Sequence, residues 1–81
     1  IEEVILLRAK CFKESYDIEK TIENLSKVIE INKNNWEAYN ILGKIQLDEG
    51  NYYKAIEFLE KSYQIKKDPI SLRDLIDCYS N

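Results

Sequence analysis

Apolar residues recur at spacings of three and four along most of the 81-residue chain, which is the pattern of helices with one buried face. Residues 18–32 show this pattern most clearly, because Ile18, Ile22, Leu25 and Ile29 would share one side of a helix. Short polar segments with turn-forming residues stand between such stretches. The pattern predicts five helices, over residues 2–14, 18–32, 36–48, 52–66 and 69–80.

The predicted helix boundaries have local chemical causes. Residues 32–35 form a polar, asparagine-rich turn, since Asn tolerates left-handed backbone geometry. Gly50 ends the third helix, because glycine adopts the left-handed conformation at no steric cost. Asp68 and Pro69 begin the fifth helix, where Asp caps free N–H groups and Pro lacks a donor that would be unused. Connections of about three to five residues make neighbouring helices antiparallel.

The chain also repeats itself after 34 residues. When residues 1–35 are placed on residues 35–69, nine of the 35 pairs are identical. A fixed period of this size is typical of helical-repeat solenoids, in which each unit buries its apolar face against its neighbours. We therefore expect a single all-α domain over residues 1–81, cut from a longer protein. Its parts are repeat one at about 2–35, repeat two at about 36–68, and a half repeat or capping helix at about 69–81.

The second unit resembles a tetratricopeptide repeat. The resemblance rests on Trp36, Tyr39, Leu42, Gly43, Gly50, Asn51, Tyr52, Ala55, Leu59 and Ser62. In that family a glycine of the first helix lets the second helix cross closely on a small residue, and Gly43 and Ala55 match those two positions. The first unit matches less closely, through Ile5, Ala9, Phe12, Thr21, Leu25 and Val28. The resemblance implies a right-handed α-solenoid of antiparallel helix pairs, with two repeats and one additional helix.

The resemblance further implies that the first helices of the repeats line a concave groove. Lys10, Asn40 and Lys44 would be aligned across adjacent units, and Arg73 would extend the row. We expect a basic, hydrogen-bonding strip for a peptide, preferably acidic, because Lys binds carboxylates and Asn pairs with backbone amides. An ordinary solvated face, with acidic neighbours offsetting the strip, is the alternative. The predicted groove residues are Lys10, Lys13, Asn40, Lys44, Leu47, Arg73 and Asp77.

One subclass of the family is not matched. Co-chaperones of this fold hold a C-terminal carboxylate with lysine, asparagine and arginine side chains from three repeats. The equivalent positions here are Leu6, Lys10, Ile41, Ile70 and Asp74. Only Lys10 fits, so we expect no clamp of that kind.

Charge and length exclude several classes of protein. The formal net charge is −3 with both signs interleaved, whereas nucleic-acid binders usually carry a basic surplus. RNA-binding helical repeats of similar length are disfavoured for the same reason. No apolar run approaches 18 residues and no targeting segment is visible. We therefore expect a cytoplasmic protein with no membrane or nucleic-acid partner.

Enzyme chemistry and cofactor binding are not expected. The chain has no histidine, and its two glycines do not form a phosphate-binding loop. Cys11 and Cys78 occupy the same position in the first and third units, which places them too far apart for a disulfide. We interpret both as small buried apolar side chains in a reducing compartment, without a metal role.

The resulting functional prediction is a protein–protein interaction module or scaffold that binds a peptide segment of a partner. The alternative is a structural or oligomerisation segment of a longer array, which could self-associate through its open ends. A regulatory domain of a larger enzyme is a further alternative. Tyr53 and Phe58 lie off the main apolar stripes, so they either pack on a neighbouring repeat or form a contact patch.

Overall fold

The computed structural model describes residues 1–80 and places five α-helices there, with no strand among them. These helices are α1 (Glu2–Glu14), α2 (Ile18–Ile31), α3 (Trp36–Asp48), α4 (Tyr52–Ile65) and α5 (Pro69–Ser80). The five helices and the all-α fold class predicted from periodicity are confirmed, and every boundary agrees to within one residue.

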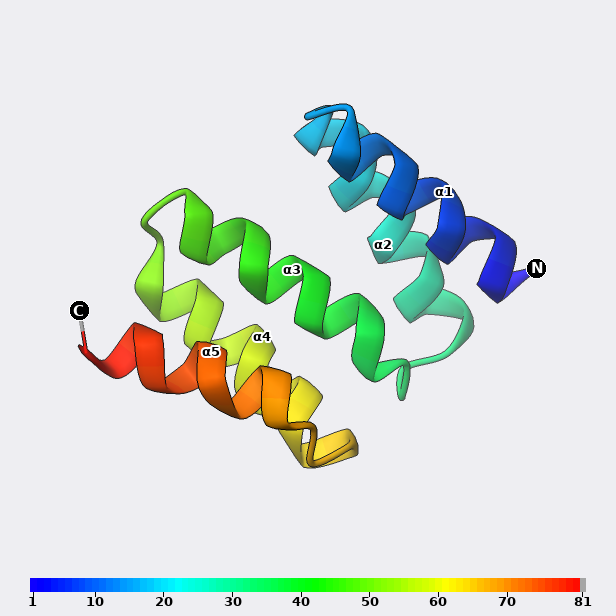
Figure 1. The fold of residues 1–81 in the computed structure, drawn as a ribbon. Helices are drawn as coiled ribbons and strands as arrows, with labels where there is room; N and C mark the ends of the chain where they lie inside the picture. The colour runs from blue at the N-terminus through cyan, green and yellow to red at the C-terminus, as the bar shows by residue number, and fades with distance from the viewer. Residues whose placement is uncertain (81) are drawn as a thin grey trace.

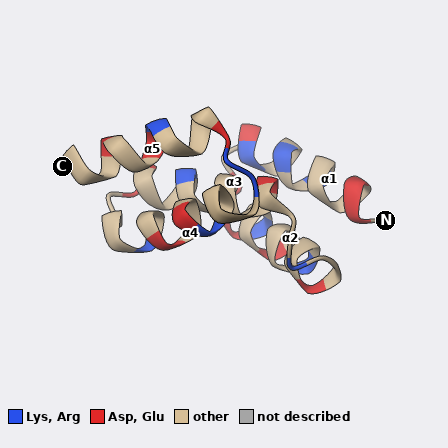
Figure 2. Cartoon of the chain, turned by 90° about the horizontal axis from the view of Figure 1, so that it is seen from below, with Lys and Arg blue, Asp and Glu red and all other residues tan. Residues whose placement is uncertain are grey.

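The helices form two layers. In Figure 2, α1, α3 and α5 lie in one layer, and α2 and α4 lie in the other. Helix α3 is central, because it contacts α2, α4 and α5 (Figure 1). Helix α3 therefore forms a hairpin with α4 and also packs on α2 of the unit before it, and α5 packs on the second unit in turn, which is the stacking that the 34-residue period predicts.

Two apolar clusters hold these layers together. The first joins α1, α2 and α3 around Ala9, Leu25 and Ile45, and the second joins α4 and α5 around Leu59 and Cys78. Leu25 and Leu59, which occupy the same position in the two units, are both completely buried. Their equivalence shows that one packing scheme is used twice.

Gly43 lies at the closest approach of α3 and α4. A Cβ atom at this position would lie 2.6 Å from Leu59 Cγ and 2.7 Å from Leu59 Cδ2, which is shorter than any normal contact. Ala55, on the facing helix, is completely buried, and its carbonyl oxygen would be 3.4 Å away. The small residues at these two positions therefore set the distance between the two helices of the second unit.

The turns after α1 and α3 have the same backbone geometry but different residues. In the first, the Asp17 amide donates to the Phe12 carbonyl and Tyr16 has φ 62°. In the second, the Asn51 amide donates to the Gln46 carbonyl and Gly50 has φ 81°. A glycine suits this left-handed position, whereas a tyrosine there is strained.

Replacing Tyr16 with glycine is expected to raise the free energy of unfolding by about 0.5–1 kcal/mol. The left-handed conformation costs a non-glycine residue about 1–2 kcal/mol, part of which is offset by the greater freedom of glycine in the unfolded chain. Urea denaturation of the single variant measures the gain. The reciprocal Gly50→Tyr variant should be destabilised by a similar amount. Equal stability of all three proteins would contradict strain at Tyr16.

Both ends of the stack present apolar side chains to solvent. On α1 these are Val4, Leu7 and Cys11, whereas the equivalent residues of α3 pack on the preceding unit. On α5 they are Leu72, Ile76 and Tyr79.

The buried location predicted for Cys11 is therefore wrong. Cys11 is exposed, because no helix within residues 1–80 covers that side of α1. Cys78 is buried as predicted, since α5 packs on α4. Both thiols are free. Burial raises the pKa of the Cys78 thiol, with smaller contributions from the charges of Asp74 and Asp77.

Candidate functional site

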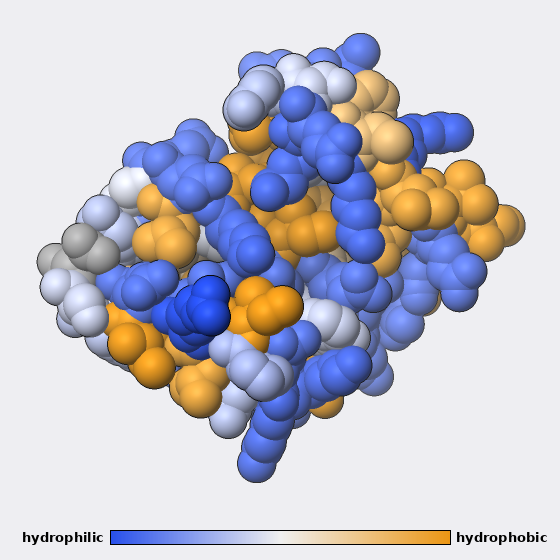
Figure 3. Space-filling model, in the orientation of Figure 1, coloured by the Kyte–Doolittle hydropathy of each residue, from blue (hydrophilic) through white to orange (hydrophobic). Residues whose placement is uncertain are grey.

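The exposed surface of α1, α3 and α5, which we call the odd-helix face, carries the residues predicted to form the groove. Figure 2 marks basic residues on all three of these helices, with acidic residues close to them. Figure 3 views the same face and shows hydrophilic residues over much of it, with separate apolar patches between them. The face is therefore mixed in charge and in polarity.

Lys10 is paired across two units. Its Nζ lies 3.2 Å from Glu37 Oε2, and both side chains remain about two-fifths exposed. An ion pair at such a position contributes about 0–1 kcal/mol and is screened by salt. Lys10 is therefore positioned on the face, but its charge is already partly balanced by α3.

Asn40 is not available on this surface, contrary to the sequence-based expectation. Its side chain is buried, and Nδ2 donates to Ser71 Oγ at 2.8 Å. Ser71 Oγ lies 3.1 Å from Ser62 Oγ, which also donates to the Trp36 carbonyl. Helix α5 covers Asn40, so its amide joins α3 to α5 instead of facing a ligand. We call Asn40, Ser62 and Ser71 the polar layer.

The other predicted residues remain on or near the surface. Lys13, Lys44 and Leu47 are half-buried, and Arg73 and Asp77 are exposed. Among the charged residues of the face, Lys10, Lys13, Lys44 and Arg73 are accompanied by Glu37, Asp48, Asp74 and Asp77. Acidic side chains therefore lie beside the predicted basic row, and the basic strip stays a prediction.

Asp74 is the residue of this region that sequence reasoning missed. Burial raises the pKa of its carboxyl group, Lys44 and Arg73 lower it, and Asp77 and Asp48 raise it further. Within residues 1–80, Asp74 Oδ2 is the buried side-chain oxygen without a hydrogen-bond donor. The sequence contained an indication of this. Asp74 stands 33 residues after Ile41, at the spacing that relates α5 to α3, so a carboxylate occupies a position that is apolar in the second unit.

A hollow lies on the other side of the molecule, between α2 and α4. Its volume is about 480 Å³, and its apolar lining consists of Ile22, Ile29, Leu42 and Phe58. Phe58, expected on the surface, is half-buried here and packs against the first apolar cluster. Tyr53 is 89 % exposed, as the sequence indicated.

The described part of the chain offers no grouping of three or more His, Cys, Asp or Glu side chains suited to a metal ion. None of the five helices is both long and apolar enough to span a membrane.

Comparison with known proteins agrees with the architecture. A family model described as "Tetratricopeptide repeat" matches residues 37–69, which is the unit that carries Gly43 and Ala55. Residues 37–69 are a tetratricopeptide repeat. Tetratricopeptide repeats are a protein-interaction fold and not an enzyme fold, so the match supports a protein–protein interaction module.

Curated relatives of this tetratricopeptide repeat chain are much longer proteins. Anaphase-promoting complex subunit 7 of Dictyostelium discoideum is 29 % identical over 63 residues, covering 78 % of this chain and 11 % of that protein. The mitochondrial import receptor subunit TOM70 of Rattus norvegicus is 34 % identical over 59 residues, covering 73 % of this chain and 10 % of that protein. The Mus musculus protein of the same name gives the same values. The chain thus spans about a tenth of the length of these relatives.

Proposed function

We propose that this chain binds a peptide segment of a partner protein along the odd-helix face. The observation that carries the proposal is the buried oxygen of Asp74, which has no hydrogen-bond donor within residues 1–80 and lies near the charges of Lys44 and Arg73. A buried polar group without a partner is unfavourable, so a ligand that supplies a donor is bound more tightly. The backbone N–H of an extended peptide is such a donor.

Lys44 and Arg73 would then meet acidic or carbonyl groups of the same peptide. Lys carries three donors and Arg carries five, and neither accepts a hydrogen bond, so both select oxygen-rich ligands. Lys10 contributes less, because a ligand must first compete with Glu37 for its ammonium group. We therefore propose that the peptide carries an acidic side chain where it contacts α3 and α5. The surface does not specify the other side chains of the peptide.

The mechanism is passive recognition on a preformed surface. The helix backbones keep their positions, the Asp74 carboxyl group turns toward the surface to meet the peptide N–H, and the peptide loses its own conformational freedom, which limits the affinity. A stable interface buries about 800 Å² on each partner, and a stack of this size offers less. We expect micromolar dissociation constants that weaken as salt rises.

The double variant Lys10→Ala/Lys44→Ala is expected to weaken binding of such a peptide by about five- to thirtyfold, corresponding to about 0.5–1 kcal/mol for each exposed charge contact. The ligand would be selected from displayed twelve-residue peptides and measured by calorimetry. Lys27→Ala/Lys61→Ala is the matched control, because these lysines occupy equivalent positions on α2 and α4. Equal effects of both double variants would refute a site on the odd-helix face.

The apolar ends of the stack favour a second candidate function, a structural segment that associates through these ends. Val4 and Leu7 at one end, and Leu72 and Ile76 at the other, are exposed. Sedimentation velocity separates the two candidates. A monomer at all concentrations that still binds the selected peptide supports the interaction module, whereas self-association without peptide binding supports the structural segment.

A further inference from the structure

A second surface runs along one edge of the molecule, where the odd-numbered helices end and the even-numbered helices begin. It comprises residues 13–20, 47–54 and 77–80, and we call it the turn edge. In Figure 1 the α1–α2 turn, the α3–α4 turn and the end of α5 follow one another along the same side of the molecule. The edge adjoins the peptide site proposed above, which centres on Lys44 and Asp74, and the odd-helix face and the turn edge share Lys13, Leu47, Asp48 and Asp77.

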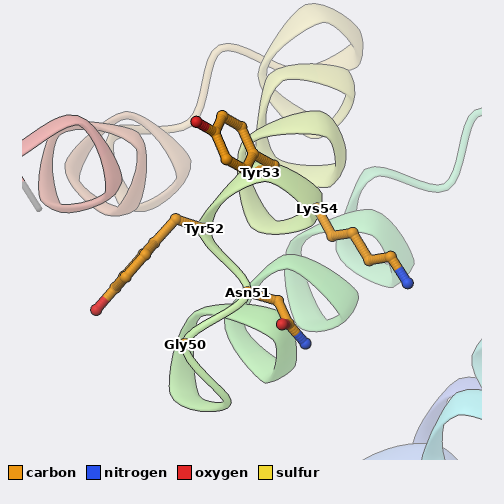
Figure 4. A pocket seen from close by; sticks show the side chains of 5 residues that line it. All are labelled: Gly50, Asn51, Tyr52, Tyr53 and Lys54. Atoms are coloured by element: carbon orange, nitrogen blue, oxygen red, sulfur yellow. The ribbon is translucent and has the colours of Figure 1, made fainter.

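The turn edge holds every tyrosine that is exposed in the described chain. Tyr16 and Tyr53 are 86 % and 89 % exposed, and Tyr52 and Tyr79 are also exposed. The remaining tyrosines, Tyr39 and Tyr63, are buried and half-buried. In Figure 4 the rings of Tyr52 and Tyr53 point away from one another at the start of α4, beside a hollow of about 350 Å³. Flat aromatic surface is therefore offered to solvent at successive turns.

The same edge carries the whole net charge of the chain. It contains six acidic residues (Glu14, Asp17, Glu19, Asp48, Glu49 and Asp77) and three basic residues (Lys13, Lys20 and Lys54). The rest of the sequence contains nine residues of each sign. A second hollow of about 110 Å³ joins the first two turns, where Tyr16 lies near Asp48 and Glu49. Each of the three segments of the edge thus carries at least one carboxylate and at least one tyrosine.

Two features of the edge are unfavourable for the fold itself. Glu14 and Asp48 are the last residues of α1 and α3, where the helix dipole already places partial negative charge. Tyr16 occupies the left-handed position at which the second unit uses Gly50. Local rules that are broken without a structural gain indicate a functional surface.

We propose that the turn edge docks an arginine-containing segment of a partner protein. A guanidinium group stacks on tyrosine rings and also forms paired hydrogen bonds with carboxylates, so it suits both components of the edge. Lys20 provides an internal example, since its ammonium lies 5.5 Å from the Phe12 ring centre and 3.9 Å from Asp17 Oδ2. The acidic surplus repels phosphate, which disfavours nucleic acid, and it repels the same edge of a second copy.

The test uses a fluorescein-labelled twelve-residue peptide of alternating arginine and glycine, with binding to the 81-residue chain followed by fluorescence anisotropy. Tyr16→Asn/Tyr53→Ser should weaken binding about tenfold, the combined effect of two exposed cation–π contacts. Asn is chosen because it tolerates the left-handed backbone of residue 16. Ile31→Ser is the matched control, since Ile31 is an exposed apolar residue at the opposite edge, and it should change affinity less than about twofold.

A second pair of variants separates a local site from general charge attraction. Asp48→Asn/Glu49→Gln should weaken binding about tenfold, whereas Glu30→Gln/Glu60→Gln, which removes the same charge from exposed positions on α2 and α4, should change it less than about twofold. The proposal is overturned if the peptide does not bind, if the tyrosine variant binds as well as the parent, or if both carboxylate variants weaken binding equally. The Lys10→Ala/Lys44→Ala variant should still bind the arginine peptide with the affinity of the parent. A failure of the proposed peptide site on the odd-helix face can therefore be distinguished from a failure of the proposed arginine site on the turn edge.

Discussion

Replacing Gly43 with alanine is expected to lower the free energy of unfolding by about 2 kcal/mol. The new Cβ would lie 2.6 Å and 2.7 Å from two carbon atoms of Leu59, which is completely buried. Overpacking of this severity costs about 3 kcal/mol. The better helix propensity of alanine offsets about 1 kcal/mol of that cost. Thermal and urea denaturation would both measure the loss.

A double-variant cycle with Leu59 identifies the cause. Leu59→Ala alone should cost about 3 kcal/mol, because it leaves a cavity in the second apolar cluster. In Gly43→Ala/Leu59→Ala the close contact no longer exists, so the gain in propensity remains and the double variant should lose only about 2 kcal/mol. Additive losses, which would total about 5 kcal/mol, would show that Gly43 is needed for a reason other than the Leu59 contact.

The helices of this protein could be predicted because their causes are local. Asp17 caps the start of α2, because its side chain accepts a hydrogen bond from the Lys20 amide, and Asn35 caps α3 in the same way. Such caps and the apolar spacing of each helix lie within a few residues of one another in the sequence. The repeat then predicted the stacking, because Leu25 and Leu59 must be buried by the same kind of neighbour.

The surface could be predicted less well, because it depends on contacts between units. Helix phase placed Asn40 on the odd-helix face, but α5 covers it with Ser71. The pairing of Lys10 with Glu37 joins helices that are 27 residues apart. The exposure of Cys11 reflects which side of α1 has no neighbour within residues 1–80. These outcomes follow from the relative positions of helices, which a spacing pattern does not give.

The polar layer connects the interior of the protein to its surface. Its buried polar residues stabilise the packing of the helices that form the odd-helix face. Ser62 and Ser71 are completely buried and Asn40 is nearly so, and they join α3, α4 and α5. Ser62 also donates to the Trp36 carbonyl at the start of α3. Because α5 carries Arg73 and Asp74, the same hydrogen bonds that dock this helix also position the proposed peptide site.

Replacing Ser71 with alanine is therefore expected to cost about 2 kcal/mol, because it removes the acceptor of the buried Asn40 amide. Ser80→Ala is the matched control on the same helix, since Ser80 is exposed and donates to the Ile76 carbonyl of its own helix. Both changes are Ser→Ala substitutions on α5, so a much larger loss in Ser71→Ala reports the polar layer. Hydrogen exchange in residues 69–80 should accelerate in Ser71→Ala.

The Asn40→Leu/Ser71→Ala variant tests whether the unsatisfied amide is the cause of that loss. When both polar partners are replaced by apolar groups, no buried donor is left without an acceptor, and the cost should fall below about 1 kcal/mol. If the double variant is less stable than Ser71→Ala, the layer acts through shape and not through hydrogen bonding. If instead the double variant is nearly as stable as the parent protein, its affinity for the selected peptide should also match that of the parent. The reason is that α5 would again hold Arg73 and Asp74 against α3. Recovery of stability without recovery of binding would mean that the position of α5 does not determine the peptide site.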